Sequence, residues 1–418
     1  RERALVLVGR CHEFETVPFK GLDGVIDSLS RHLKASSSEE LGRLLPPDLG
    51  DLATIFPVLR RIAPIASAYA RRSTAERTVQ RIRAAGLACL REMLRRIAEG
   101  TPLLVLIDDV QWADEDTSRA LVELLKDQHP PAMLLLLGSR PDDSTPVIAE
   151  LFGASGGRAV IEAARVTVDL EPLDETATLA LIRAELHAGA RGDLQAMMHD
   201  DLVATLAREA HGNPFAACEL ARFVREEEGD FEAGVVGRSI DEIVVKRADG
   251  LDAAARELLD VIAVSGEPTE ERILRRSAGL SADDRASTDT LRAKLWIRSL
   301  RSGSATLLDA VHDRVRESIA SVLPAPRRAA IHGALALALE ATESPAHDRL
   351  ARHFAAAGEA SLAHHHALVA SEEARASLAL RRSADLLGLA IELATDAQRA
   401  ELMPRYAQAL ADAGLFER

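Results

Sequence analysis

The first third of the chain alternates short apolar runs with longer amphipathic stretches. The apolar runs predict buried strands and span residues 4–9, 103–109 and 133–138. A fourth strand is expected where Val166, Val168 and Leu170 alternate with polar residues. Helical periodicity covers residues 22–33, 75–97 and 117–127. Strands that alternate with helices in this way predict an α/β fold with a parallel sheet.

Local signals refine this pattern at two places. Asp116 or Thr117 is expected to cap the helix at 117–127, because short polar side chains accept hydrogen bonds from the first turn of a helix. Pro46, Pro47 and Pro57 predict a loop-rich insertion before the second long helix.

Beyond Pro172 the pattern changes to helices. Amphipathic helices are predicted at 174–187, at 200–210 and from Pro214 to Val224, with Gly212-Asn213-Pro214 as a sharp break between the last two. Residues 229–237 are predicted to form a linker. Short helices and a hairpin, 295–298 with 305–308, then outline a winged helix. From Ile331 onward, alanine-rich helices resemble tetratricopeptide-like pairs.

Composition narrows the class of protein. The chain has 418 residues, which favours several domains, and 47% of them are hydrophobic, which supports real cores. The formal net charge of −14 argues against a nucleic-acid surface in this stretch. Three unspaced cysteines predict neither a disulfide framework nor a zinc site, so a cytoplasmic location is expected. No apolar run reaches membrane-spanning length.

The second apolar run carries the candidate chemistry. It ends in Asp108-Asp109 and continues into Gln111-Trp112-Ala113-Asp114. Carboxylates at the end of a buried parallel strand lie where open α/β sheets bind ligands. One carboxylate can hold Mg²⁺ while its neighbour orients a water, as phosphoryl transfer requires.

A phosphate-binding loop of the Gly-x-x-x-x-Gly-Lys-Ser/Thr type is absent from the sequence. None of the five lysines follows a glycine or precedes Ser or Thr, and the glycine-rich stretch 153–158 is interpreted as an ordinary loop. The chain opens on Arg1 directly before its first strand. The pair Asp108-Asp109 after a buried strand resembles the Walker B motif of P-loop NTPases. This resemblance implies a chain cut after its phosphate-binding loop, with an unpaired gap beside apolar strands and weak ATP binding on its own. A degenerate, non-hydrolysing ATPase is the alternative.

Five motifs in order resemble the AAA-type module of STAND signalling ATPases, a branch of the P-loop NTPases. They are Val6-Leu7-Val8-Gly9-Arg10-Cys11 with Pro18-Phe19, Asp108-Asp109 with Gln111-Trp112-Ala113-Asp114, Gly138-Ser139-Arg140, Gly212-Asn213-Pro214, and Val311-His312-Asp313. The second resembles a Walker B motif, the third a sensor arginine and the fourth a Gly-x-Pro motif. The fifth is similar to a Met-His-Asp motif, with Val at its first position. The nearest likeness is to modules of large bacterial serine/threonine protein kinases and of LuxR-type transcription activators.

The resemblance implies a role for each candidate residue. Asp108 would coordinate Mg²⁺, Asp109 would act as general base or orient the water, and Arg140 would sense the γ-phosphate. On the helical side, Gly212 and Pro214 would pack against the adenine and His312 would touch the β-phosphate of ADP. Structural alternatives remain: the two aspartates can cap a strand, Arg140 can be a surface residue, Pro214 can simply start a helix, and His312 can be an ordinary residue at a helix start.

The resemblance also implies an organisation and a function. The expected domains are 1–172 as a P-loop NTPase core without its first strand, 173–235 as a helical domain, 236–325 as a winged-helix-like domain and 326–418 as the start of helical repeats. We expect a regulatory switch that binds and hydrolyses ATP within a large bacterial signalling protein, with a kinase as the output. A LuxR-type activator and an inactive scaffold are the alternatives. Protein partners are expected at the helical repeats, with nucleotide-dependent self-association, but no membrane and no direct nucleic-acid contact.

Overall fold

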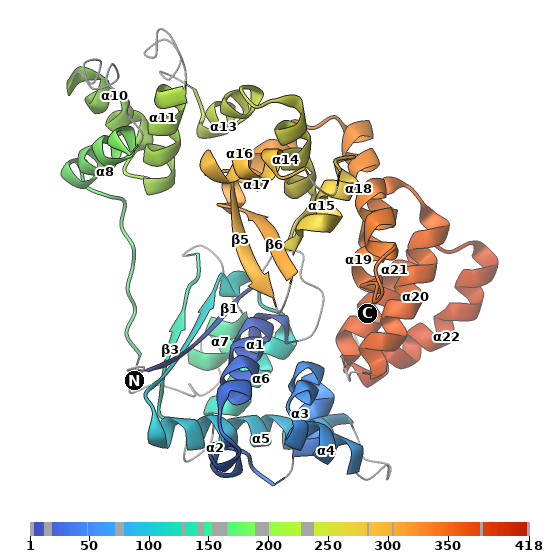
Figure 1. Ribbon diagram of the computed structural model, residues 1–418. Coiled ribbons are helices and arrows are strands. Elements are labelled where there is room, and N and C mark those ends of the chain that lie inside the picture. The colour runs from blue at the N-terminus through green and yellow to red at the C-terminus, as the bar shows by residue number, and fades with distance from the viewer. Residues whose placement is uncertain are drawn as a thin grey trace. The chain divides into compact units, whose positions relative to one another are not determined.

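The chain folds into two compact units, each described here by itself. The computed structural model describes residues 4–11, 19–47, 49–71, 79–126, 130–140, 146–152, 165–188, 200–226, 238–281, 284–302, 305–376 and 379–415. One unit contains residues 1–167 and 360–418, and the other contains residues 168–359 (Figure 1). Among the helices described, none combines the length and the apolar character needed to cross a membrane.

Three parallel strands form the sheet of the first unit, which confirms the three predicted apolar strands. They are β1 Leu5–Arg10, β2 Leu103–Asp108 and β3 Met133–Leu137, in the order β1-β2-β3. The register pairs Arg10 with Asp108 and Ile107 with Leu137. The carboxyl ends of all three strands therefore meet at one edge of the sheet.

The two faces of this sheet differ in burial. On one face Leu7, Val105 and Ile107 are almost fully buried in a core shared with the surrounding helices. Those helices are α1 Lys20–Ala35, α3 Leu49–Ile55, α5 Val79–Gly100, α6 Glu115–Leu125 and α7 Pro146–Phe152. On the other face Val8 is 48% exposed and Leu136 is 51% exposed. β3 is the outer strand of the described sheet on the side away from β1.

The predicted fourth strand is wrong. Residues 165–174 lie outside any helix or strand, and Val166, Val168 and Leu170 are 85%, 74% and 92% exposed. Alternating hydrophobicity stabilises a strand only when a neighbouring backbone accepts its hydrogen bonds and a core accepts its apolar side chains. Neither condition is met among the described residues around this segment.

The predicted cap of α6 is also wrong. Its N-cap is Asp114, whose carboxylate accepts hydrogen bonds from the Thr117 backbone N–H at 2.7 Å and from the Thr117 hydroxyl at 2.6 Å. Burial raises the pKa of the Asp114 carboxyl, and the hydrogen bonds from Thr117 oppose this effect. Asp114 therefore shapes the loop after β2 as a structural carboxylate.

The stretch predicted as a loop-rich insertion is mostly helical, although Pro46 and Pro47 lie outside any helix, as predicted. It contains α2 Ser38–Leu44, α3, a 3₁₀ helix at Pro57–Arg61, and α4 Ala63–Arg71. Pro57 is the first residue of the 3₁₀ helix and Pro64 the second residue of α4. At these positions the missing N–H would have no helical partner anyway, so the prolines start these helices instead of breaking them.

Three helices among the described residues at the start of the second unit pack around one small core. They are α8 Glu175–His187, α10 Asp200–Ala210 and α11 Pro214–Glu226, and they agree with the predicted amphipathic segments. Asp174 caps α8 by accepting a hydrogen bond from the Ala177 N–H at 2.7 Å. The predicted linker, residues 229–237, lies outside the described residues, as does the glycine-rich stretch 153–158.

A second core follows, built from helices and a small antiparallel sheet. The helices are α13 Ile240–Asp249, α14 Ala253–Ser265, α15 Glu271–Ser277, α16 Ala286–Ala293 and α17 Asp313–Val322. The predicted hairpin is present as β5 Ile297–Ser302 with β6 Ala305–Ala310, and β4 Thr269–Glu270 pairs with β6 (Figure 1). Trp296, directly before β5, is fully buried and anchors the hairpin to this core.

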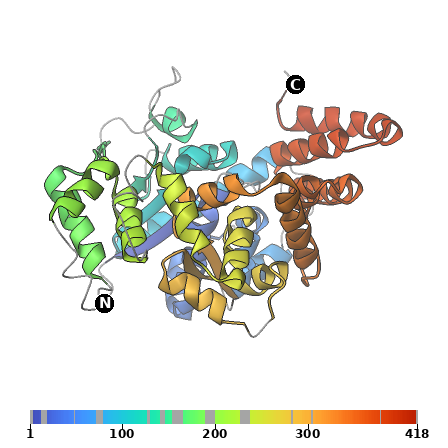
Figure 2. The same ribbon diagram turned by 90° about the horizontal axis from the view of Figure 1, so that it is seen from above.

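Paired helices complete both units. In the second unit α18 Ala325–Glu340 packs against α19 His347–Ala357. In the first unit α20 Ala360–Ala376, α21 Leu380–Glu392 and α22 Asp396–Asp412 pack consecutively, as the red helices of Figure 2 show. Small residues line their contacts, among them the buried Ala370, Ala374 and Ala384. This is the tetratricopeptide-like helical region predicted from the alanine-rich pattern.

Candidate functional site

Asp108 and Asp109 occupy the carboxyl end of β2, where sequence analysis predicted the chemistry. Asp108 ends the strand with an exposed side chain, and its Oδ1 accepts a hydrogen bond from the Asp109 N–H at 3.0 Å. Asp109 has φ 54° and ψ 41°, a left-handed conformation that is rare for residues other than glycine. The Val110 N–H donates to the Gly138 carbonyl at 2.9 Å and fixes this turn against the end of β3.

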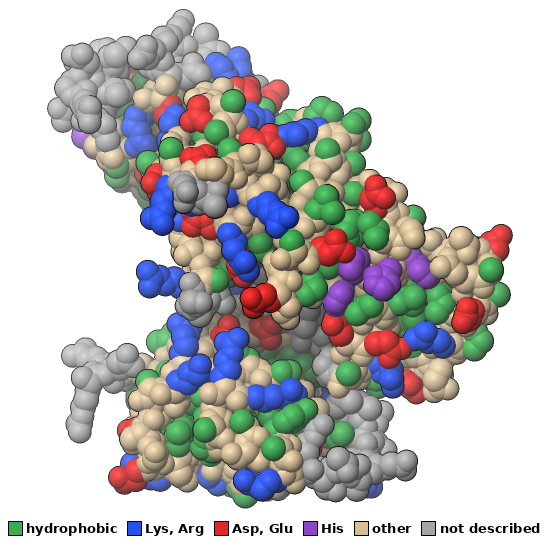
Figure 3. Space-filling model, turned by 45° about the vertical axis from the view of Figure 1, so that its right-hand side comes forward, with side chains coloured by type: hydrophobic (Ala, Val, Ile, Leu, Met, Phe, Trp, Pro, Cys, Tyr) green, Lys and Arg blue, Asp and Glu red, His purple; other side chains and the backbone are tan. Residues whose placement is uncertain are grey.

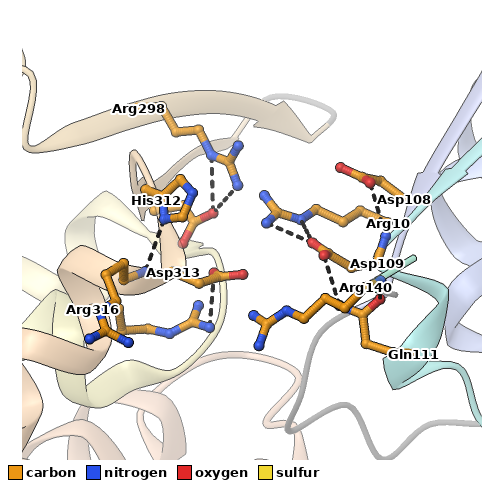
Figure 4. Close-up of polar contacts among 11 residues, drawn as sticks. Arg10, Asp108, Asp109, Gln111, Arg140, Arg298, His312, Asp313 and Arg316 are labelled. Carbon is orange, nitrogen blue, oxygen red and sulfur yellow. Dashed lines mark hydrogen bonds and ion pairs between the residues drawn. The ribbon is translucent and has the colours of Figure 1, made fainter. Parts of the chain in front are cut away.

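Arg10 is the partner of Asp109 that sequence analysis did not assign. Its Nε and Nη2 both lie 2.8 Å from Oδ2 of Asp109. The other carboxylate oxygen accepts a hydrogen bond from Gln111 Nε2 at 3.0 Å (Figure 4). The signal was present in the sequence, because Arg10 ends β1 and the carboxyl ends of adjacent parallel strands meet.

The backbone of Arg140 contacts the same cluster. Its N–H donates to Oε1 of Gln111 at 3.3 Å, so Gln111 bridges Arg140 and Asp109 (Figure 4). The Arg140 guanidinium lies 5.7 Å from the centre of the Trp112 ring, within reach of a cation–π interaction. The structure thus brings together Asp108, Asp109 and Arg140 at one edge of the sheet.

Gly138 lets β3 approach Asp108 closely. A Cβ at this position would overlap Oδ1 of Asp108. The Gly138 N–H donates to the Ile107 carbonyl at 3.0 Å, which continues the β2–β3 ladder to the site. The Asp108 carboxylate can therefore occupy its position because residue 138 has no side chain.

The donor set around Asp108 suits Mg²⁺ better than a metal held by protein ligands alone. Among the described residues, no group of three or more His, Cys, Asp and Glu side chains could hold a metal ion. Mg²⁺ is usually bound by one or two carboxylates together with substrate phosphates and waters. A single exposed carboxylate at the end of a parallel strand fits this pattern.

Gly212 and Pro214 form the turn between α10 and α11 in the second unit. His211 and Gly212 have φ values of 50° and 71°, and a Cβ on residue 212 would lie 2.5 Å from the Leu173 carbonyl oxygen. Oδ1 of Asn213 accepts a hydrogen bond from the Ala216 N–H at 3.1 Å, and Pro214 is the first residue of α11. The predicted break at Gly212-Asn213-Pro214 is therefore present, with Asn213 as a cap and Pro214 at the start of the helix.

His312 lies at the amino terminus of α17 as its N-cap. Its Nδ1 accepts a hydrogen bond from the Arg314 N–H at 3.1 Å (Figure 4). Its ring stacks on Phe215, with ring centroids 4.4 Å apart and an interplanar angle of 21°. The structure therefore joins the Gly-Asn-Pro turn to His312 through Phe215, a residue that sequence analysis missed because the contact links distant elements.

Comparison with known proteins agrees with this architecture. Residues 1–137 match the family described as AAA ATPase domain. No curated protein sequence gives a significant match. The fold is similar to the crystal structure of a STAND protein (Signal Transduction ATPase with Numerous Domains) with a tetratricopeptide repeat sensor from Pyrococcus horikoshii, with a TM-score of 0.51 and 12% sequence identity. The match covers 99% of this chain and 60% of the other, so the chain spans about three fifths of that relative's length.

The family match and the structural similarity both include the parallel sheet. The matched residues contain β1, β2 and β3, and so they include Arg10, Asp108 and Asp109. The structural similarity extends from this sheet through the helical repeats. Residues 1–137 are therefore similar to AAA ATPase domains, and the fold of the chain is similar to that of a STAND protein.

Proposed function

We propose that this protein is a nucleotide-dependent switch of a signalling protein. ATP together with Mg²⁺ favours one state, and ADP favours another. The observation that carries the proposal is the pair Asp108-Asp109 at the carboxyl end of β2, inside the matched ATPase domain. Ligands of open α/β sheets bind at this end of the strands. A nucleotide that binds two states with different affinity shifts the equilibrium between them.

Asp108 is the residue proposed to hold Mg²⁺. Bound there with the nucleotide, the ion would neutralise charge on the phosphate oxygens. Asp109 would orient or deprotonate the attacking water, and Arg140 would bind the γ-phosphate through its planar guanidinium. In support, Gln111 accepts a hydrogen bond from the Arg140 N–H and donates one to Asp109, so the two residues lie beside each other.

The second unit is proposed to contribute the residues that recognise the nucleoside diphosphate, ADP. Gly212 and Pro214 would pack against the adenine, and His312 would donate to the β-phosphate of ADP. The stack of Phe215 on His312 supports a shared role, because it links the two motifs physically. We propose that the domain that carries His312 is a winged helix that connects domains instead of reading DNA; its helices and its hairpin support this proposal.

The parent protein is proposed to be a large bacterial serine/threonine protein kinase, with a LuxR-type activator as the alternative. The helical repeats would bind protein partners, a role suggested by the tetratricopeptide sensor of the Pyrococcus horikoshii relative, and nucleotide-dependent self-association would follow. On the face shown in Figure 3, the described residues expose both acidic and basic side chains.

A non-hydrolysing scaffold is the second candidate function. It is favoured by the contacts of Asp109, since both of its carboxylate oxygens accept hydrogen bonds from Arg10 and Gln111. A general base needs an oxygen that faces the water it activates. In a scaffold, nucleotide would still bind, but Asp109 would serve only to hold Arg10.

Nucleotide binding and turnover in the full-length gene product test this function. We expect ADP and ATP to bind more tightly with Mg²⁺ than with EDTA, and Asp108→Ala to abolish that difference. Asp109→Asn should leave binding intact and lower hydrolysis by about 100-fold or more. Glu39→Gln, a change of an exposed carboxylate in the same unit, is the control. Mg²⁺-dependent binding without hydrolysis in the wild type would favour the scaffold, and no binding would refute both.

A further inference from the structure

A hollow lies between the end of α1, α2 and the start of α4 in the first unit, away from the carboxylates of β2 (Figure 1). Its volume is about 600 Å³, within the size range of sites for small molecules. α1 runs back along β1, with Gly21 beside Cys11 and Gly24 beside Val8. The last turn of α1, where the hollow begins, therefore lies toward the amino ends of the strands, opposite to the edge that carries Asp108.

The apolar lining of the hollow is aliphatic. Leu33, Leu49 and Ile62 are buried, and Leu41 and Leu45 are half-buried; all five line the hollow. The described residues around it include no aromatic side chain. A flat ring would find no stacking partner here, whereas an alkyl chain can make contacts along its whole length. The lining therefore favours an aliphatic ligand.

Two cations line the same hollow. Lys34 ends the last turn of α1 and Arg61 ends the 3₁₀ helix, and both side chains are exposed. Neither makes an ion pair or a side-chain hydrogen bond with a residue that the structure describes. The described lining contains no acidic side chain. The hollow is thus positively charged at its polar part, and it complements an anion.

Other arginines of this region already hold the walls in place. Arg96 of α5 donates to the Leu45 carbonyl at 2.9 Å, which fixes the segment after α2. Arg60 donates from Nε to the Ala53 carbonyl at 2.9 Å, and its guanidinium carbon lies 3.8 Å from the centre of the Tyr69 ring. These contacts tie the 3₁₀ helix to α3 and α4, so the hollow is formed without a ligand.

We propose that this hollow binds a single-chain aliphatic carboxylate of medium length. Its alkyl chain would lie on the leucine and isoleucine side chains, and its carboxylate would bind Lys34 and Arg61. The guanidinium of Arg61 can hold a carboxylate through two nitrogens, and Lys34 adds a flexible point charge. The site is separate from Asp108 and Asp109, so the inference does not depend on the proposed nucleotide function.

Binding of fatty acids to the full-length gene product, measured by isothermal titration calorimetry, tests the class of ligand. Affinity should rise from hexanoate through octanoate to decanoate, by up to about fourfold for each added methylene. Decan-1-ol has the same chain as decanoate without the charge, and it should bind about tenfold more weakly or worse. Equal binding of decanoate and decan-1-ol, or no binding of decanoate, overturns the proposal.

The two cations are tested by neutral variants. Lys34→Gln and Arg61→Gln should each weaken decanoate binding by about tenfold and leave decan-1-ol binding unchanged. The matched control is Arg31→Gln, because Arg31 is an exposed cation of α1 that does not line the hollow. If Lys34→Gln and Arg61→Gln bind decanoate as the control does, the carboxylate is not held by these residues and the proposal fails.

The aliphatic part is tested by a matched pair of leucines in α2. Leu41 lines the hollow and Leu44 does not, although both pack half-buried against the same core. Leu41→Asn and Leu44→Asn should lower the melting temperature by similar amounts, but only Leu41→Asn should weaken decanoate binding. An equal loss of binding in both variants would place the ligand elsewhere.

Sedimentation of the wild type and Leu41→Asn tests the other occupant of an apolar hollow, a second copy of this chain. A monomer in both is expected. A wild-type dimer that Leu41→Asn dissociates, together with no decanoate binding, would put the second copy in the hollow and overturn the proposal.

Discussion

The guanidinium of Arg10 binds the carboxylate of Asp109 through two nitrogens, Nε and Nη2, each 2.8 Å from the same oxygen. Gln111 occupies the other oxygen at 3.0 Å. Asp109 is therefore restrained by its own protein, in a backbone conformation that is strained for an aspartate. If Asp109 is the proposed base, one of these contacts has to give way to water before its carboxylate can act.

Arg10→Gln is expected to relieve this restraint. If Asp109 is the base, the basal kcat for ATP hydrolysis should rise by roughly threefold to tenfold with KM nearly unchanged, because the nucleotide contacts remain while the carboxylate is released. The control is Arg31→Gln, a change of an arginine in α1 that donates to the Ser28 hydroxyl. A fall in kcat of the size seen in Asp109→Asn would show instead that Arg10 supports catalysis.

Gly138→Ala is expected to disturb Asp108 without unfolding the sheet. The new methyl group would overlap the carboxylate of Asp108, and this carboxylate has to rotate away because the backbone of residue 138 is held in the β2–β3 ladder. We expect the Mg²⁺-dependent part of ADP affinity to fall by about tenfold, with little change in the far-ultraviolet circular dichroism spectrum.

The matched control for Gly138→Ala is Gly42→Ala in α2. A Cβ on residue 42 would have no atom within 4 Å, and the residue lies inside a helix, so alanine should stabilise the chain by about 0.5–1 kcal/mol. If both variants keep full Mg²⁺ dependence, Asp108 is not the magnesium ligand.

The fold could be predicted where local pattern and long-range partner agree. The apolar runs of β1, β2 and β3 are strands because each has a neighbour in the sheet. Val166 and Val168 have the same local pattern and form no strand, since no described backbone pairs with them. Pro57 predicts a loop by its residue type alone, yet it occupies the first turn of a 3₁₀ helix, which a proline tolerates.

The site, like the fold, could be predicted only in part from the sequence. Asp108 and Asp109 follow an apolar strand directly, so their place at the end of the sheet could be inferred from sequence. Arg10 could have been inferred too, from the rule that adjacent parallel strands end together. Phe215 could not, because its partner His312 is brought to it by the packing of α11 and α17 on α13, which no local pattern encodes.

Gly212→Ala is expected to destabilise the second unit more than a change at another left-handed glycine. At Gly212 the φ of 71° and the nearby Leu173 carbonyl both oppose a side chain. At Gly279, with φ 68°, no atom lies within 4 Å, and only the backbone penalty applies.

Urea unfolding should therefore show a loss of about 3 kcal/mol for Gly212→Ala and about 1 kcal/mol for Gly279→Ala. Equal losses would mean that the turn relaxes around residue 212, and the Gly-Asn-Pro geometry would then tolerate a side chain.

His332 and His353 are expected to make stability depend on pH. Their Nδ1 atoms lie 2.9 Å apart between α18 and α19, so one ring donates and the other accepts, and the accepting ring has to be neutral. Burial, followed by Arg328 and Arg352, lowers the pKa of His332 to about 4. Burial, followed by His332, Arg349 and Arg352, lowers the pKa of His353 well below its usual value.

The direction of the pH effect follows from these lowered values. Between about pH 6.5 and pH 4 the unfolded chain binds more protons than the folded one, so the free energy of unfolding falls as the pH falls. Urea unfolding should show a loss of about 2 kcal/mol between pH 7.5 and pH 5, after a discount for the partial exposure of His332. The double variant His332→Gln/His353→Gln should lose less over this range. His187→Gln, at the exposed end of α8, should keep the wild-type slope, and an equal slope in all three proteins would exclude the histidine pair as the cause.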